Sequence, residues 1–139
     1  MESAHPKPAL QSLRVLLVED NADIAYVMQA LVKRAGHEVR WASDGGDALN
    51  QAQQWNPHVC LIDIGLPDMN GYELAVALRQ APVSQPLLVA LTGFGEPEDR
   101  SRANEAGFDR FVVNAITIDV LYDIFNTCNP AEPTLNASA

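Results

Sequence analysis

Three largely apolar runs in this chain end on acidic or hydroxyl side chains, and this pattern constrains the fold more than any other feature. The side chains that follow the runs are Glu19 and Asp20, then Asp63, then Thr92. Short runs rich in branched residues are typical of strands buried on both faces of a sheet. Because parallel strands of an open α/β sheet place their carboxyl ends at one edge, we expect these side chains to share one pocket. The runs lie at residues 13–18, 58–62 and 87–91.

A pocket of this composition predicts a metal ion. Carboxylates a few ångströms apart raise one another's pKa, so Glu19, Asp20 and Asp63 would repel one another without a cation. An all-oxygen set with room for water suits Mg²⁺ better than Zn²⁺. Asp63 could then act as a covalent nucleophile toward an electrophile held in line by the metal. The alternative interpretation is that Glu19 and Asp20 cap the next helix and that Asp63 simply ends a strand.

Strand-like and helix-like segments alternate along residues 13–127. This alternation predicts five βα units that form a parallel sheet with helices on both faces. Apolar residues at helical spacing, from Ile24 and Val27 onward, predict a first helix that begins at Asn21 or Asp23 and faces the core. The other expected elements are strands at 38–42, 58–63, 87–92 and 110–113, and helices from 43 or 44 to 55, at 72–80, at 97–106 and from 117 onward.

The helix expected at 97–106 differs from the others because its residues are mostly charged or polar. Only Ala103 and Ala106 are available for burial, so its attachment to the sheet should be weak. A weakly attached helix suits a movable output surface, but it is equally compatible with a helix that is merely solvated.

Length and charge limit the function classes. A chain of 139 residues with 47% hydrophobic residues fits one globular domain, expected at 13–127, with disordered tails or linkers at 1–12 and 128–139. A net charge of -9 argues against direct binding of nucleic acid, and no DNA-binding output domain is expected. The sequence has no run of eighteen apolar residues and no secretory signal at its start. We therefore expect a cytoplasmic protein without membrane insertion.

Other site classes have little support in the sequence. The two cysteines, Cys60 and Cys128, do not make a disulfide framework and are expected to be small buried hydrophobes. The histidines lack metal-ligand spacing, which argues against zinc. The phosphate-binding loop, the dinucleotide fingerprint and the nucleophile elbow of hydrolases are all missing from the sequence.

Four segments together closely resemble the receiver domain of two-component response regulators. The resemblance covers roughly residues 13–127 and implies a flavodoxin-like, doubly wound fold with strand order 2-1-3-4-5 and five helices. It also implies that a histidine kinase or a histidine phosphotransfer protein donates a phosphoryl group to an aspartate. Such a domain is not an enzyme beyond catalysing its own phosphorylation and dephosphorylation. The segments are residues 16–21, 63–74, 90–93 and 105–109.

The resemblance assigns a role to each residue of the expected pocket. Asp63 matches the phosphoacceptor, and Glu19 and Asp20 match the acidic pair around Mg²⁺. Gly65 matches the residue whose backbone carbonyl completes the metal shell. These roles agree with the physics of phosphoryl transfer, which depends on positioning the group and neutralising its charge.

Two further residues match the conformational switch of the family. Thr92 matches the hydroxyl that moves toward the phosphoryl group, and Phe111 matches the aromatic side chain that changes rotamer with it. This movement would link the pocket to a surface formed by the fourth helix, the fifth strand and the fifth helix. A downstream protein, or a second copy in a homodimer, would bind that surface.

The sequence departs from the family after the fifth expected strand. Asn114 stands where the family has a lysine, and Ala115 stands where it has a proline. Asn114 can still donate a hydrogen bond, but a charge-assisted bond is about twice as strong. Two readings stay open: a working receiver with altered kinetics, or a degenerate receiver that binds partners without phosphorylation. A small hydrolase or a flavin-binding protein on the same fold is a third.

Restoring the missing lysine gives a first prediction. If the site is otherwise competent, Asn114→Lys is expected to raise the phosphorylation rate or the extent of the conformational response, because it returns a positive charge to the surroundings of the phosphoryl group. The time course of phosphoryl incorporation measures the effect. An unchanged response would mean that the lysine is not what limits this protein.

Overall fold

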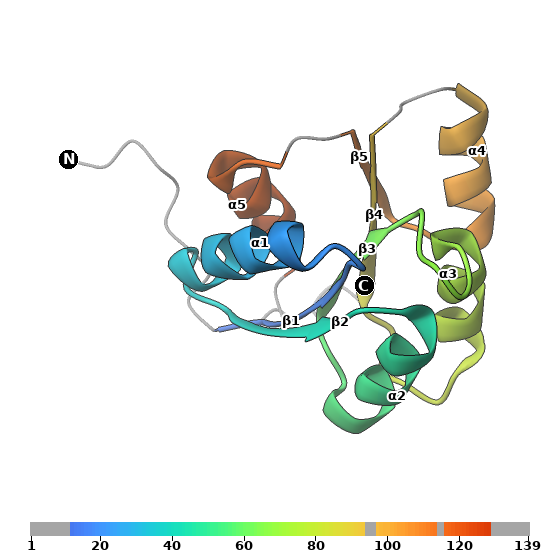
Figure 1. Ribbon diagram of the computed structural model, residues 1–139, viewed down its shortest axis with the longest axis horizontal. Coiled ribbons are helices and arrows are strands. Elements are labelled where there is room, and N and C mark those ends of the chain that lie inside the picture. The colour runs from blue at the N-terminus through green and yellow to red at the C-terminus, as the bar shows by residue number, and fades with distance from the viewer. Residues whose placement is uncertain (1–11, 94–96, 114–115, 129–139) are drawn as a thin grey trace, which may run out of the picture.

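The computed structural model describes residues 12–93, 97–113 and 116–128. They form a five-stranded sheet in the order β2-β1-β3-β4-β5, in which every neighbouring pair is parallel (Figure 1). This confirms the expected α/β fold and its strand order. The elements are β1 (Arg14–Val18), α1 (Ala22–Arg34), β2 (Glu38–Ala42), α2 (Gly45–Trp55), β3 (Val59–Asp63), α3 (Gly71–Gln80), β4 (Leu87–Thr92), α4 (Pro97–Ala106), β5 (Arg110–Val113) and α5 (Ile118–Thr127).

The register of the central strands brings the polar residues to one edge of the sheet. Val18 at the end of β1 pairs with Ile62 of β3, and Asp63 pairs with Leu91 of β4. The residues that follow β1, those that end β3 and those that end β4 therefore lie at the same level. The three apolar runs of the sequence become the three inner strands, as predicted.

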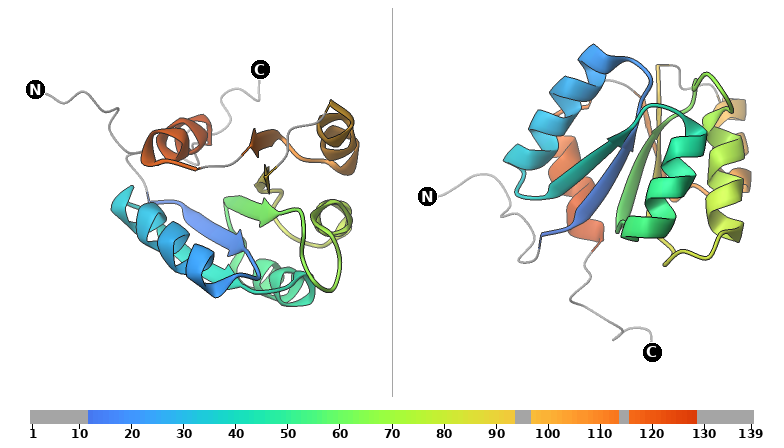
Figure 2. Two further views of the ribbon diagram at one scale, coloured as in Figure 1. Left: turned by 45° about the horizontal axis from the view of Figure 1, so that its top comes forward. Right: turned by 60° about the horizontal axis from the view of Figure 1, so that its bottom comes forward.

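Two apolar cores hold the layers together, one on each face of the sheet. Successive strand residues point to opposite faces, so Leu16 and Leu88 pack under α2, α3 and α4, whereas Leu17 and Val89 pack under α1 and α5. The views in Figure 2 show this division of the helices. All four side chains are fully buried, which is consistent with an inner strand covered on both sides.

The helix boundaries follow from local chemistry. α1 ends before Gly36 and α4 before Gly107, and these glycines have φ of 97° and 109°, a left-handed conformation that glycine adopts without strain. The end of α4 agrees with the helix expected at 97–106. At the opposite ends of four helices, a polar side chain accepts a hydrogen bond from a backbone amide of the first turn. These caps are Asn21 for α1, Asp44 for α2, Asn70 for α3 and Thr117 for α5.

The apolar stripe of α1 is only partly buried, which corrects the prediction for this helix. Met28 and Val32 are buried as expected, together with Ala25. Ile24 and Val27, however, are 48% and 56% exposed. The stripe is wider than the face that contacts the sheet, and one side of it remains open next to the carboxyl edge of the strands.

None of the helices in the described part of the chain has the length and apolar character needed to cross a bilayer. The tails expected at 1–12 and 128–139 lie outside the described residues, apart from Ser12 and Cys128. Their disorder therefore stays a prediction. Cys60 is buried as expected, while Cys128 is only partly buried.

Candidate functional site

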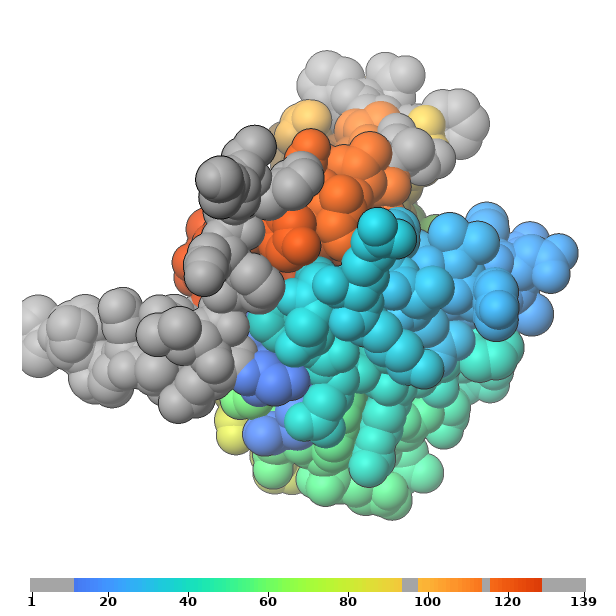
Figure 3. All heavy atoms as spheres, turned by 90° about the vertical axis from the view of Figure 1, so that its left-hand side faces the viewer, coloured from blue at the N-terminus to red at the C-terminus, as the bar shows by residue number. Residues whose placement is uncertain are grey.

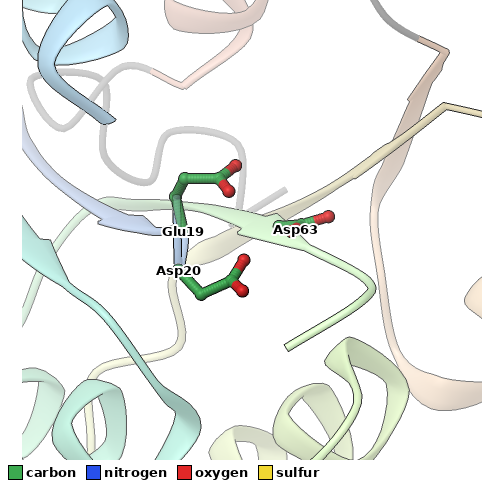
Figure 4. A group of neighbouring side chains, drawn as sticks. All are labelled: Glu19, Asp20 and Asp63. Atoms are coloured by element: carbon green, nitrogen blue, oxygen red, sulfur yellow. The ribbon is translucent and has the colours of Figure 1, made fainter. Parts of the chain in front are cut away.

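Three carboxylates converge at the carboxyl edge of the sheet. Glu19, Asp20 and Asp63 each place an oxygen within 4.8 Å of the others. Figure 4 shows the first two following β1 and the third at the end of β3. Glu19 is buried, Asp63 is partly buried and Asp20 is exposed. The structure thus confirms the convergence that the strand pattern predicts.

The backbone at Glu19 is fixed by the neighbouring strand β2. Its amide donates to the Ala42 carbonyl at 3.0 Å, and its carbonyl accepts from the Trp41 indole Nε1 at 2.7 Å. Its carboxylate Oε2 accepts from the Asn21 amide at 3.1 Å. These bonds hold the Glu19 carboxylate at a defined place beside the pocket.

The electrostatics of the group oppose full ionisation. Burial raises the pKa of Glu19 to about 7; the charges of Asp63 and Asp20 also raise this pKa, while the Asn21 amide lowers it. Burial likewise raises the pKa of Asp63, with a further rise from Asp20 and an opposing effect of the Gly65 amide, which lies 3.3 Å from Asp63 Oδ1. A positive charge between these groups would relieve both effects.

The donor set fits a small hard cation. All three side chains offer oxygen, which Mg²⁺ prefers, and the exposure of Asp20 leaves one side of the group open to water. Gly65 is exposed and lies two residues after Asp63, so its backbone is near the same group. The carbonyl contact expected of Gly65 stays a prediction.

The raised pKa of Glu19 predicts how metal-free stability depends on pH. Between the ordinary value of 4.5 and about 7, the unfolded chain ionises this carboxyl while the folded protein keeps it protonated. The folded state then binds more protons, so the free energy of unfolding falls as pH rises through this window, by up to about 3 kcal/mol. Denaturant titrations in the presence of a metal chelator measure this fall.

Glu19→Gln is the control for that experiment, because glutamine keeps an oxygen for the Asn21 amide but does not titrate. The control is needed because burial lowers the pKa of His37 and His58, which makes stability rise with pH in part of the same window. The difference between wild type and Glu19→Gln isolates the carboxyl. Parallel pH profiles for the two proteins would contradict the prediction.

Of the two expected switch residues, only Thr92 lines the same pocket as the carboxylates. Thr92 lines a pocket of about 560 Å³ together with Glu19 and Asp63. Phe111 lies on β5 opposite Ala90 of β4, and the Arg100 guanidinium of α4 lies 4.7 Å from the centre of its ring. Asn114 and Ala115 lie outside the described residues.

Helix α4 is held by few apolar contacts, as its composition predicts. Ala103 and Ala106 are its buried apolar residues. Two arginine–aromatic contacts, which the sequence analysis did not predict, also join it to the domain. Arg100 lies over Phe111, and the Arg102 guanidinium lies 4.3 Å from the ring centre of Tyr72 in α3. Such contacts contribute about 0.5–1 kcal/mol each at exposed sites, which is consistent with weak attachment.

Comparison with known proteins agrees with this geometry. The family model described as "Response regulator receiver domain" matches residues 15–126. The chain is 35% identical over 116 residues to a gliding motility regulatory protein of Myxococcus xanthus, covering 82% of this chain and 15% of that protein. It is also 35% identical over 107 residues to the transcriptional regulatory protein PhoP of Escherichia coli K12, covering 77% of this chain and 48% of PhoP. This chain thus spans less than half of either relative.

A solved structure gives the same result at the level of the fold. The chemotaxis protein CheY4 of Vibrio cholerae superposes with a TM-score of 0.78 at 27% identity, covering 85% of this chain and 99% of CheY4. The match includes the strand order and the flanking helices described above. The chain therefore belongs to the receiver domain family of two-component response regulators.

Proposed function

We propose that this receiver domain accepts a phosphoryl group on Asp63 from a phosphohistidine of a histidine kinase or a histidine phosphotransfer protein, with Mg²⁺ bound by Glu19, Asp20 and Asp63. The observation that carries this proposal is the convergence of three carboxylates within 4.8 Å, two of them with a raised pKa. Because carboxylates this close repel one another, the cluster is well suited to bind a cation. The cation would in turn attract the incoming phosphoryl group.

In the proposed reaction, a carboxylate oxygen of Asp63 attacks phosphorus. The bond from phosphorus to the donor nitrogen breaks, an aspartyl phosphate forms and the donor imidazole leaves. When bound, Mg²⁺ would supply the positive charge that balances the oxygens of the transferring group. Glu19 and Asp20 would hold that charge beside Asp63, and Gly65 would contribute its backbone carbonyl.

The surface beside Asp63 supports a protein as the phosphoryl donor. The pocket that holds Glu19 and Asp63 extends along α1, where the exposed side chains of Ile24 and Val27 line it. Figure 3 views the face on which α1 and α5 lie side by side. An amphipathic surface next to the reacting carboxylate suits a helical donor protein better than a small donor alone.

The conformational response to phosphorylation of Asp63 would spread through Thr92 and Phe111. The Thr92 hydroxyl would donate a hydrogen bond to a phosphoryl oxygen, and Phe111 would move into the space that threonine leaves. Movement of this ring changes its contact with Arg100 and therefore the position of α4. The α4, β5 and α5 surface is proposed to bind a downstream protein or a second copy. We propose that the domain has this signalling role in the cytoplasm.

The competing function is a degenerate receiver that binds its partner without phosphorylation, which the substitution at Asn114 keeps open. Incubation with Mg²⁺ and acetyl phosphate, followed by intact mass measurement, separates the two. The proposed function predicts the addition of one phosphoryl group that requires Mg²⁺. No addition, under conditions that modify a control receiver, would support the degenerate form.

A further inference from the structure

Asp68 is an exposed residue in the loop between β3 and α3, and its carboxylate accepts three hydrogen bonds from backbone amides. Its Oδ1 accepts hydrogen bonds from the Gly45 amide at 2.8 Å and from the Met69 amide at 2.9 Å, and its Oδ2 accepts from the Gly46 amide at 3.0 Å. Two of these donors belong to another element, so the side chain links the loop to α2 across 23 and 22 residues of sequence.

The two distant donors are the first residues of α2, whose amides have no partner within the helix. A second carboxylate, Asp44, caps the same helix locally by accepting from the Asp47 amide at 2.8 Å. The first turn of α2 therefore receives one acidic cap from its own sequence and another from the β3–α3 loop. The hydrogen bonds from Gly45 and Gly46 lower the pKa of Asp68, which keeps this carboxylate ionised.

Gly45, the first residue of α2, allows this close approach. A Cβ at Gly45 would lie 2.5 Å from Met69 Cγ and 3.3 Å from Asp68 Oδ1. The loop thus rests directly on the helix at a position where a larger residue would displace it. This accounts for Gly45, whereas a Cβ at Gly46 would make ordinary contacts, 3.6 Å from Asp68 Oδ2.

The same loop begins at the phosphoacceptor position. Its base is closed by the Gly71 amide, which donates to the Ile64 carbonyl at 2.7 Å, and the Ile64 amide donates to Leu91 of β4 at 3.2 Å. Between these anchors lies Gly65, whose amide donates to Asp63 Oδ1. The loop is therefore anchored at its base to the sheet and at Asp68 to α2.

We propose that Asp68 is a positioning residue for the metal site: by anchoring the loop to the first turn of α2, it holds Gly65 and Asp63 in the arrangement that binds Mg²⁺. Asp68 is not one of the three carboxylates that converge; it acts through the loop. The inference rests on the proposed function, since it assigns a residue that prepares the same site.

The experiment compares Asp68→Ala with Asp44→Ala. Both variants remove one carboxylate from the N-terminus of the same helix and one negative charge from the protein, so Asp44→Ala controls for the loss of a cap and of a charge. Only Asp68→Ala releases the loop. We expect its Mg²⁺ dissociation constant, measured by titration calorimetry, to rise about tenfold, as for partners that orient metal ligands, while Asp44→Ala stays within about twofold of wild type.

Two further measurements make the test sharper. Asp68→Asn keeps an oxygen at the Oδ1 position for Gly45 and Met69, so it should recover most of the affinity. In metal-free protein, hydrogen exchange of the Ile64 and Gly65 amides should be faster in Asp68→Ala than in Asp44→Ala. This second readout reports the loop itself and does not depend on Mg²⁺ or on phosphorylation.

The outcomes separate this inference from the proposed function. Equal Mg²⁺ affinity in Asp68→Ala and wild type, or an equal loss in both alanine variants, would overturn the positioning role. A wild-type protein that binds Mg²⁺ but gains no phosphoryl group would contradict the proposed function and leave the positioning role intact. A wild-type protein that binds no Mg²⁺ would overturn both.

Discussion

Replacing Asp63 by asparagine is expected to abolish phosphoryl incorporation while leaving the fold intact. The amide has nearly the same shape as the carboxylate and can still accept a hydrogen bond from Gly65, but it is a far weaker nucleophile toward phosphorus. The substitution also removes one of three crowded negative charges, and the charge of Asp63 is one of the causes of the raised pKa of Glu19. Intact mass after incubation with Mg²⁺ and acetyl phosphate measures the loss.

Stability data distinguish this loss from unfolding. Because a charge is removed from a repulsive group, metal-free Asp63→Asn should be at least as stable as wild type at neutral pH. Asp123→Asn is the matched control: it also removes one carboxylate, from an exposed ion pair with Arg110 on another part of the surface. It should keep full incorporation. Phosphoryl incorporation by Asp63→Asn at the wild-type level would refute the assignment of the acceptor.

Replacing Asp20 by asparagine is expected to change stability and metal binding in opposite directions. The exposed Asp20 raises the pKa of both Glu19 and Asp63. Its neutralisation should therefore stabilise the metal-free protein. The same change removes one of the three charged ligands and should raise the Mg²⁺ dissociation constant at least tenfold, or about 1.4 kcal/mol of binding free energy. Calorimetric titration and chemical denaturation of the same samples give both quantities.

Asp23→Asn provides the comparison for Asp20→Asn. Asp23 lines the pocket of Glu19 and Asp63 from α1 but is not one of the three converging carboxylates. Its loss should reduce Mg²⁺ affinity only through weakened long-range attraction, which salt screens. If the two variants bind Mg²⁺ equally well, the group acts as a general negative surface and not as a set of ligands.

Local signals that agree with one another were sufficient to predict a parallel sheet with helices on both faces, whereas its strand order came from the resemblance to the receiver family. The inner strands are apolar runs in the sequence. Gly36 and Gly107, which have positive φ, follow the ends of α1 and α4. The convergence of Glu19, Asp20 and Asp63 follows from a rule about parallel strands, and the observed register confirms it.

Contacts between elements far apart in sequence could not be predicted in this way. Helical spacing places Ile24 and Val27 on the apolar side of α1, but it cannot tell where the sheet ends and the pocket begins. The bonds from Asp68 to the start of α2 cross 22 or more residues and depend on how two loops meet. The Arg100 contact with Phe111 likewise depends on the tilt of a weakly attached helix.

Mapping the phosphoryl group to a residue is the most direct measurement. After incubation with Mg²⁺ and acetyl phosphate, borohydride reduction converts an aspartyl phosphate into homoserine, which peptide mass spectrometry can locate. We predict conversion at Asp63 alone, dependent on Mg²⁺ and lost in the presence of a metal chelator. Conversion at another residue, or no conversion while a control receiver reacts, would contradict the role of this carboxylate group as a phosphoacceptor site.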